Sequence, residues 1–229
     1  MKIGRKVVGT VAYLGGVPAL LEGFVWSWSQ MIQYNTMHLC GPDEEIRYER
    51  SKLSYHASAR NELCENMKGD WILMLDADHA FDADIVHRML NSMGRYKLDV
   101  LSALYVDKAA PHVPQVYHWN EEQQLYTKIV KWETDERVFQ VDATGAGTLL
   151  IRREVLDAIK KELNEAPFSI IPPFSEDLSF YRRLAKLDIK AFCDPIIESR
   201  HIATVGVTYA MTPVEELAAV GHRYQVEAR

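Results

Sequence analysis

The sequence contains little that would tie it to an oxidising compartment, a membrane or a nucleic acid. Its 229 residues include only three cysteines, Cys40, Cys64 and Cys193, and no C-x-x-C pair. Neither a disulfide framework nor a zinc knuckle is therefore indicated, and a reducing compartment fits best. No run of eighteen or more uncharged apolar residues occurs, so we expect no span of a bilayer. The net charge of −6 gives no general attraction to nucleic acid.

A secretory signal is also not supported. Basic residues at positions 2, 5 and 6 precede apolar ones, as they do in such signals. The segment 15–22, however, is interrupted by two glycines, a proline and a glutamate, and no convincing small-x-small cleavage site follows. We therefore expect a soluble, cytoplasmic protein.

The apolar residues of the chain are arranged as in an α/β protein. Hydrophobic residues make up 48% of the sequence, enough for one substantial core. Short apolar runs alternate with segments of helical spacing, which is typical of α/β folds. We expect helices near 21–28, 53–67, 82–93, 155–163 and 175–187. We expect strands at Val7–Tyr13, Met37–Cys40, Trp71–Leu75, Val100–Tyr105, Leu125–Trp132, Phe139–Val141, Thr148–Ile151 and Ala191–Ile197.

The segment GDWILMLDADHAF carries paired charges directly after an apolar run. Trp71–Leu75 is too short for a helix and does not alternate, which predicts a strand buried on both faces of a sheet. If the strand geometry persists, Asp76 and Asp78 leave it on the same face. Ligands of open parallel sheets bind at the carboxyl ends of strands, and two carboxylates there suit Mg²⁺ or Mn²⁺. A polar turn explains the same residues equally well.

Three other places carry charge that has two explanations. Arg60 lies on an otherwise core-facing helical stripe. It either forms a structural ion pair or reaches toward an anionic or nucleotide ligand. Glu176 and Asp177 follow a Pro-Pro loop, where they form an ordinary helix start or supply a general base. His201, after the last expected strand, is a metal-ligand candidate, although a lone histidine is more often structural.

Together these segments resemble nucleotide-sugar-dependent glycosyltransferases of the GT-A fold, in particular small soluble bacterial or phage-type members of the cellulose-synthase-like family. The resemblance spans about residues 6–205, and it rests on the order of the segments more than on any one of them. It implies a single Rossmann-like α/β domain over residues 1–210, with a central, mostly parallel sheet flanked by helices. Residues 211–229 would form a C-terminal arm. The segments are VVGTVAYLGGVP, SARNEL, GDWILMLDADHAF, DVLSALYVDK, DATGAGTLLIRREVL, SEDLSFYRRL and SRHIA.

The resemblance also implies roles for single residues around the donor nucleotide and a metal. Asp78 would bind the metal directly, Asp76 would lie near the ribose and the metal, and His201 would complete the metal site. Thr10 would approach the nucleobase, and Arg60 would lie near the nucleotide.

Further along the chain, the resemblance implies the catalytic residues and the sugar-binding loop. Asp177 would be the catalytic base of an inverting enzyme, with Glu176 beside it. The backbone at Gly145 and Gly147 would lie close to the donor sugar or the acceptor. The implied activity is transfer of a hexose from a UDP- or GDP-sugar to an acceptor hydroxyl, with Mn²⁺ or Mg²⁺. The acceptor stays open among a glycan, a lipid-linked sugar, a protein and a modified nucleic acid.

Two positions depart from the family pattern. Val11-Ala12 stands where the first strand usually has a proline. The acidic residue that commonly follows the second strand is not clearly placed, and Asp43 is only a candidate for it, so the nucleobase stays open.

Three alternatives fit the sequence less well. A metal-dependent phosphohydrolase would place D-x-D at the N-terminal strand. A sugar-1-phosphate nucleotidyltransferase would need a G-x-G-T-R-like loop, which GTVAYLGG does not supply. A non-catalytic nucleotide- or sugar-binding module needs no acidic pair such as Glu176-Asp177.

Overall fold

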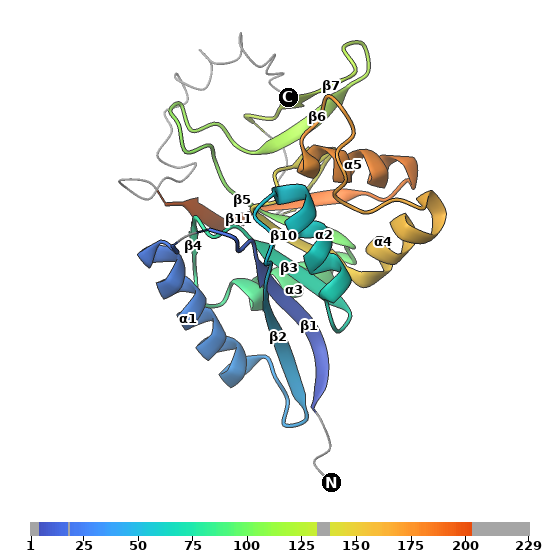
Figure 1. The fold of residues 1–229 in the computed structure, drawn as a ribbon. Helices are drawn as coiled ribbons and strands as arrows, with labels where there is room; N and C mark the ends of the chain where they lie inside the picture. Colours follow the sequence, from blue (N-terminus) through green and yellow to red (C-terminus); the bar gives the residue numbers. More distant parts are fainter. Residues whose placement is uncertain (1–4, 18, 132–137, 203–229) are drawn as a thin grey trace.

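The computed structural model describes residues 5–17, 19–131 and 138–202 of the chain (Figure 1). The expected C-terminal arm, 211–229, and the end of the expected strand at Trp132 lie outside these residues. No described helix is long and apolar enough to cross a membrane.

The main sheet has eight strands, and most of them run in one direction. β2 (Glu44–Arg50), β1 (Lys6–Tyr13) and β3 (Trp71–Leu75) are parallel neighbours. β10 (Thr148–Arg152) is antiparallel to both β3 and β5 (Val100–Leu104), so β3 and β5 point the same way. β11 (Ala191–His201) is parallel to β5 and antiparallel to β4 (His79–Phe81) and β8 (Phe139–Val141). The expected α/β fold with a mostly parallel central sheet is confirmed.

Helices cover both faces of this sheet, and β3 shows why. Alternate residues of a strand point to opposite faces. Ile72 and Met74 pack in one cluster with α2 (His56–Asn66), α4 (Arg153–Ala158), its π-helical continuation Ile159–Leu163, and α5 (Glu176–Lys186). Leu73 and Leu75 pack in a second cluster with α1 (Glu22–His38) and α3 (Ile85–Tyr96). The uninterrupted apolar run is therefore a strand with a core on each side, as predicted.

A small second sheet stands at the top of the molecule in Figure 1. β6 (Val116–Asn120) and β7 (Leu125–Lys128) form a hairpin, and β9 (Ala143–Thr144) pairs with β6. The hairpin lies beside α5, because the Arg182 guanidinium of α5 lies over the Trp119 ring of β6. β6 was not expected from the sequence.

The expected strand at Met37–Cys40 is wrong. α1 continues to His38, and the second strand is β2, whose sequence is EEIRYER. β2 is at the edge of the sheet and Ile46 is its one fully buried residue, so it needs no apolar run. Edge strands are commonly rich in charge for this reason.

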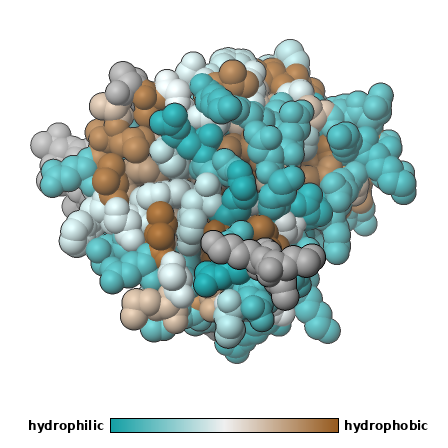
Figure 2. Space-filling view, turned by 60° about the horizontal axis from the view of Figure 1, so that its bottom comes forward, coloured by the Kyte–Doolittle hydropathy of each residue, from teal (hydrophilic) through white to brown (hydrophobic). Residues whose placement is uncertain are grey.

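The first turns of α1 leave an apolar surface exposed. Leu21 just before the helix is 43% exposed, and Val25 and Trp26 within it are also exposed. The core side is formed instead by residues such as Phe24 and Met31. Figure 2 shows apolar residues gathered at the left edge of a largely hydrophilic face, the side on which α1 lies in Figure 1.

Candidate active site

A tight turn after β3 brings together residues that are far apart in the sequence. The Asp76 N–H donates to the Gly147 carbonyl (2.9 Å), and the His79 N–H donates to the Asp76 carbonyl (3.2 Å). β4 begins at His79 and pairs with the end of β11, where His79 lies opposite His201. The turn therefore carries Asp78 and His79 to a histidine more than a hundred residues later in the chain.

Asp78, His79 and His201 form a cluster that could hold a metal ion. One ligand atom from each lies within 4.8 Å of the others. Asp78 Oδ1 is 3.9 Å from His79 Nε2. Both atoms are buried, and neither has a hydrogen-bond partner within the part of the chain that the structure describes. A buried carboxylate oxygen and a buried ring nitrogen that face each other without a partner are a costly arrangement, which a shared cation would relieve.

The two imidazole rings are oriented by their other nitrogens. His201 Nδ1 contacts the carbonyl of Val106. A carbonyl only accepts, so His201 donates from Nδ1 and keeps its lone pair at Nε2. His79 Nδ1 shares a hydrogen bond with Ser199 Oγ (2.7 Å), which leaves Nε2 facing Asp78. Burial, reinforced by His201, lowers the pKa of His79 to about 3, so this ring is neutral, the form that binds metals.

Asp78 is shared between this cluster and a lysine. Its Oδ2 contacts the ammonium of Lys108, whose side chain is 47% exposed. Burial alone would raise the pKa of Asp78, but the hydrogen bond and the charge of Lys108 outweigh it and hold the pKa below its ordinary value. Asp78 is therefore ionised, with Oδ2 in contact with the Lys108 ammonium and Oδ1 facing His79 Nε2.

Asp76 belongs to a different network, which is centred on Arg60. The Arg60 side chain is 3% exposed and lies 3.0 Å from Asp76 and 3.5 Å from Glu176. It also donates to the carbonyl of Ala146 (2.9 Å). Burial opposes the charge on Arg60, but the carboxylates of Asp76 and Glu176 outweigh it and raise the pKa above its usual range. Arg60 thus links the end of β3, the loop that contains Gly145 and Gly147 (the glycine loop) and the start of α5.

The glycine loop packs against Tyr105, a residue that the sequence analysis did not single out. The Gly147 N–H donates to the Tyr105 hydroxyl (3.1 Å). A Cβ on Gly145 would lie 1.9 Å from that hydroxyl, and one on Gly147 would lie 2.7 Å from the His79 ring. The Tyr105 ring also meets the His79 and His201 rings edge to face, at 4.8 and 5.3 Å. Only glycine fits at these two positions, because a side chain there would collide with Tyr105 and with the metal-ligand candidate His79.

Asp177 faces this loop from the start of α5. Its Oδ1 accepts the Leu178 N–H (2.8 Å) and contacts the Ser175 hydroxyl. Its Oδ2 lies 3.6 Å from the position of a Cβ on Gly145. Burial, together with the charge of Glu176, raises the pKa of Asp177. One oxygen is anchored and the other is presented to the loop, which is the arrangement that a proton acceptor needs.

Thr10 is not brought to this cluster. It is fully buried, and its hydroxyl bonds both the carbonyl and the N–H of Lys68 at 2.8 Å. The cavity at the carboxyl end of β1, about 250 Å³, begins four residues later in the chain. Its lining includes Leu14, Gly15, Val17, Ser54, His56, Asp76 and Asp78.

A second cavity also borders Asp78. It has a volume of about 490 Å³ and is lined by Asp78, Lys108, Pro111, Val113 and His201, among others. Asp78 therefore lines both cavities. His79 and Tyr105 were missed at the sequence level, and the one available signal was that His79 directly follows D-A-D.

Comparison with known families shows to which family the chain belongs. The sequence profile described as Glycosyl transferase family 2 matches residues 36–159, more than half of the 229 residues. The chain belongs to glycosyl transferase family 2. The matched segment contains Arg60, the D-A-D turn, Tyr105 and the glycine loop of this glycosyltransferase. Among curated proteins, none matches the chain.

Solved structures show the same fold. The crystal structure of A197 from STIV superposes with a TM-score of 0.57 at 14% identity, over 88% of this chain and 90% of that one. GalNAc-T7 with UDP, GalNAc and Mn²⁺ superposes with a TM-score of 0.60 at 11% identity, over 86% of this chain and 43% of that one. The family match and these neighbours together confirm the resemblance to GT-A-fold glycosyltransferases.

Proposed function

We propose that this glycosyltransferase moves a hexose from a nucleoside-diphosphate sugar to an acceptor hydroxyl, with inversion, and that it depends on a divalent metal held by Asp78, His79 and His201. The observation that carries the proposal is the pair of buried atoms, Asp78 Oδ1 and His79 Nε2, which lie 3.9 Å apart without other partners among the described residues. A mixed set of one carboxylate and two imidazoles suits Mn²⁺ better than Mg²⁺, which prefers oxygen ligands. The set therefore favours Mn²⁺.

The proposed metal ligands differ from those expected from the sequence at two residues. His79 is included, and Asp76 is not. Asp76 is engaged with the buried Arg60, whereas His79 points its Nε2 at Asp78. Asp76 lines the cavity at the end of β1. We assign this cavity to the nucleoside of the donor, and Asp76 to its ribose.

Support for a nucleotide-sugar donor comes from the fold and from the placement of the two cavities. GalNAc-T7, which shares the fold, was solved with UDP, GalNAc and Mn²⁺. In this chain the cavity of about 250 Å³ ends at Asp76 and Asp78. A nucleoside there would direct its diphosphate to the Asp78–His79–His201 cluster. A UDP- or GDP-sugar fits this proposal.

The proposed reaction uses two groups, a bound divalent ion and the carboxylate of Asp177. A bound divalent ion supplies positive charge that stabilises the leaving diphosphate as a Lewis acid. Asp177 Oδ2 takes the proton of the acceptor hydroxyl while that oxygen forms its bond to the anomeric carbon. The bond between the anomeric carbon and the phosphate oxygen breaks, and the nucleoside diphosphate leaves with the electron pair. Attack from the face opposite the leaving group inverts the configuration.

Arg60, Glu176 and Tyr105 act as positioning residues in this proposal. Glu176 lies 3.5 Å from Arg60 Nε and 3.8 Å from His56 Nδ1, so its carboxylate orients the arginine instead of taking a proton. Tyr105 holds the Gly147 backbone and both histidine rings. Tyr105 therefore contacts both ends of this loop, the Gly145 end beside Asp177 and the Gly147 end beside His79.

The test is a thermal-shift and turnover screen of UDP, GDP and their sugars, with Mn²⁺ and with EDTA. A nucleoside diphosphate at about 100 times its dissociation constant should stabilise the fold by roughly 2.7 kcal/mol, and EDTA or Asp78→Asn should remove most of this. Asp82→Asn is the matched control, because Asp82 lies near the turn but forms surface pairs with Arg88 and Arg200. Equal binding of every nucleotide in EDTA would contradict the metal assignment. A donor that binds but is never consumed would indicate a binding module.

A further inference from the structure

The loop between β5 and β6 presents a lysine to the proposed metal site. Backbone pairing of Val106 with Pro114 closes the base of this loop, and the Val106 carbonyl contacts His201. Just beyond this pairing, the Lys108 ammonium contacts Asp78 Oδ2. The loop therefore places one positive charge at the edge of the Asp78–His79–His201 cluster.

Lys108 is held in this position by Asp78 alone. The neighbouring carboxylate, Asp107, is already engaged by the ammonium of Lys128 (2.6 Å) and by the amide of Gln115. Among the residues that the structure describes, Asp78 is the one carboxylate within ion-pair distance of Lys108. The Lys108 side chain is half exposed, and its four-carbon stem is flexible. Its ammonium can therefore exchange Asp78 for another anion nearby.

A divalent ion on Asp78 would create the reason for this exchange. It would neutralise the carboxylate that attracts Lys108, and it would repel an ammonium beside it. An anion between the two cations removes the repulsion. An ion such as Mg²⁺ holds each oxygen ligand at about 2.1 Å, so a diphosphate oxygen on the same ion lies within about 4 Å of the ligating oxygen of Asp78. That position is next to Lys108.

The cavities around Asp78 leave room for this arrangement. The cavity of about 250 Å³, which we assign to the nucleoside, ends at Asp76 and Asp78. The cavity of about 490 Å³ is lined by Asp78, Lys108 and His201, and its volume is within the range of small-molecule sites, about 300–1,000 Å³. Because Asp78 borders both cavities, a nucleotide whose diphosphate reaches Asp78 from the first cavity meets Lys108 at the second.

We infer that Lys108 is a diphosphate-binding residue, which passes from Asp78 to a diphosphate oxygen when the metal and the donor bind. This inference rests on the proposed function, because it requires a nucleoside diphosphate at the Asp78–His79–His201 cluster. When the bond between the anomeric carbon and the phosphate oxygen breaks, the electron pair stays on the diphosphate. The Lys108 ammonium donates a hydrogen bond to that leaving group, and no proton is transferred.

The experiment measures nucleotide binding without turnover. Calorimetric titrations of UDP, UMP, GDP and GMP into the full-length chain at saturating Mn²⁺ compare the unmodified chain with Lys108→Met. We expect the Kd of the preferred diphosphate to rise about tenfold, the size of one lost charge-assisted hydrogen bond, and that of its monophosphate to change by less than about twofold. Mn²⁺ alone should bind Lys108→Met more tightly, because its competitor for Asp78 is gone. Two effects of opposite sign distinguish an exchanging lysine from a structural one.

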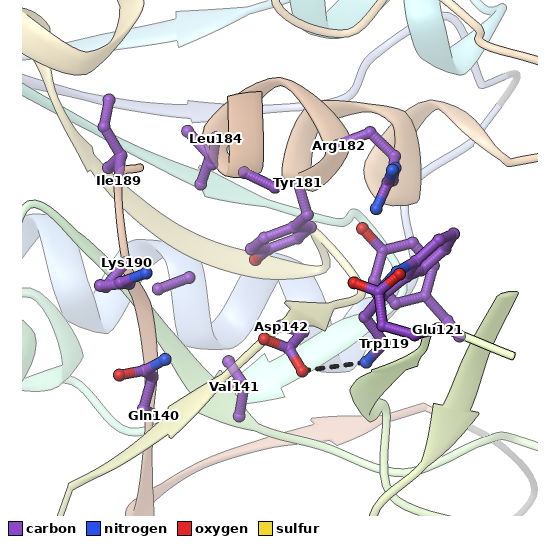
Figure 3. A pocket seen from close by; sticks show the side chains of 13 residues that line it. Trp119, Glu121, Gln140, Val141, Asp142, Tyr181, Arg182, Leu184, Ile189 and Lys190 are labelled. Carbon is purple, nitrogen blue, oxygen red and sulfur yellow. Dashed lines mark hydrogen bonds between the residues drawn. The ribbon is translucent and has the colours of Figure 1, made fainter. Parts of the chain in front are cut away.

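A third cavity, of about 320 Å³ between α5, the β6–β7 hairpin and β8, supplies the matched control. Lys190 lines it, whereas Asp78 and His201 do not. Figure 3 shows Lys190 across this cavity from Trp119. Lys190 is 54% exposed and pairs with an aspartate, Asp188, at 2.7 Å, so it resembles Lys108 in exposure and in partner. Lys190→Met removes the same charge outside the cavities that border Asp78, and it should leave every Kd within about twofold of the unmodified value.

A second variant separates the charge from the fold of the loop. Lys108→Arg keeps a positive charge and donors that bind phosphate, so it should retain most of the affinity for the diphosphate. Loss of affinity in Lys108→Met together with its retention in Lys108→Arg supports the inference.

Three results would overturn the role of Lys108. One is a diphosphate Kd that is unchanged or lower in Lys108→Met, which would make the lysine a competitor of the metal and nothing more. Another is an equal loss for the diphosphate and the monophosphate, and the third is an equal loss in Lys190→Met. Failure of all four nucleotides to bind the unmodified chain would contradict the proposed function itself, and the role of Lys108 with it.

Discussion

Asp78 Oδ1 and His79 Nε2 face each other across 3.9 Å, both buried, from neighbouring residues of one turn. Neighbouring side chains of an extended strand would point to opposite faces. The turn at Asp76–His79 lets them converge, and β4 then fixes His79 opposite His201. The proposed metal site is thus a product of the turn, and not of the strand that precedes it.

Replacing Lys108 should strengthen metal binding. Its ammonium contacts Asp78, so it competes with any cation that this carboxylate binds. We expect Lys108→Met to lower the Kd for Mn²⁺ about fivefold, which corresponds to about 1 kcal/mol for a partly exposed pair. Calorimetric titration measures this, with Lys160→Met in the π-helical segment Ile159–Leu163 as the control. Weaker Mn²⁺ binding in Lys108→Met would show that the lysine supports the site.

Removing Arg60 should cost stability as well as function. Arg60→Met leaves two carboxylates, Asp76 and Glu176, without their buried partner. We expect the free energy of unfolding to fall by about 3 kcal/mol, at the low end for a broken buried pair because Asp76 is partly exposed. Arg47→Met, which breaks the exposed pair with Glu49, should cost less than about 1 kcal/mol. Equal losses in urea denaturation would contradict the role assigned to Arg60.

Two glycines should respond in opposite ways to alanine. At Gly147 a Cβ would lie 2.7 Å from the His79 ring, so Gly147→Ala should displace the ring and weaken both stability and Mn²⁺ binding. Gly94 lies inside α3 with nothing within 4 Å of the Cβ position. Gly94→Ala should therefore stabilise the fold by about 0.5–1 kcal/mol. Melting curves with and without Mn²⁺ check both, and a neutral Gly147→Ala would mean that the loop moves freely.

The pH dependence of turnover should report Asp177. The base works only when ionised, and burial together with Glu176 raises its pKa. kcat/KM should therefore rise with pH through an apparent pKa above the ordinary aspartate value. Glu176→Gln removes a negative charge next to Asp177, so this limb should move to lower pH. Asp177→Asn should lower turnover about 10²- to 10⁴-fold and leave donor affinity intact. A limb that stays in place in Glu176→Gln would point to another group.

Strands were predictable from the sequence where their burial in the fold produces a recognisable run of apolar residues. β3 has a core on each face, and its apolar run appears directly in the sequence. β2 was misplaced because an edge strand with one fully buried residue leaves no apolar signal. The same holds for β6, whose residues other than Val116 are only partly buried.

The site was predictable in its charged residues and not in its tertiary pairings. Asp78 and His201 were expected together, and the structure places them in one cluster. His79 joins them through the pairing of β4 with β11, and Tyr105 through packing under the glycine loop. No local pattern contains either contact. Thr10 was placed by resemblance, but its hydroxyl is used within the fold by Lys68.

Pulsed electron paramagnetic resonance of the Mn²⁺–nucleoside diphosphate complex can determine whether Asp78, His79 and His201 bind one divalent ion. This measurement detects nitrogen nuclei that are bonded to Mn²⁺ and needs no turnover. We expect coupling to imidazole nitrogen from two histidines. The coupling should be reduced in His79→Gln and in His201→Gln, and unchanged in His118→Gln on the β6–β7 hairpin. Mn²⁺ bound with no imidazole nitrogen coupling in the unmodified chain would contradict the assignment of these ligands.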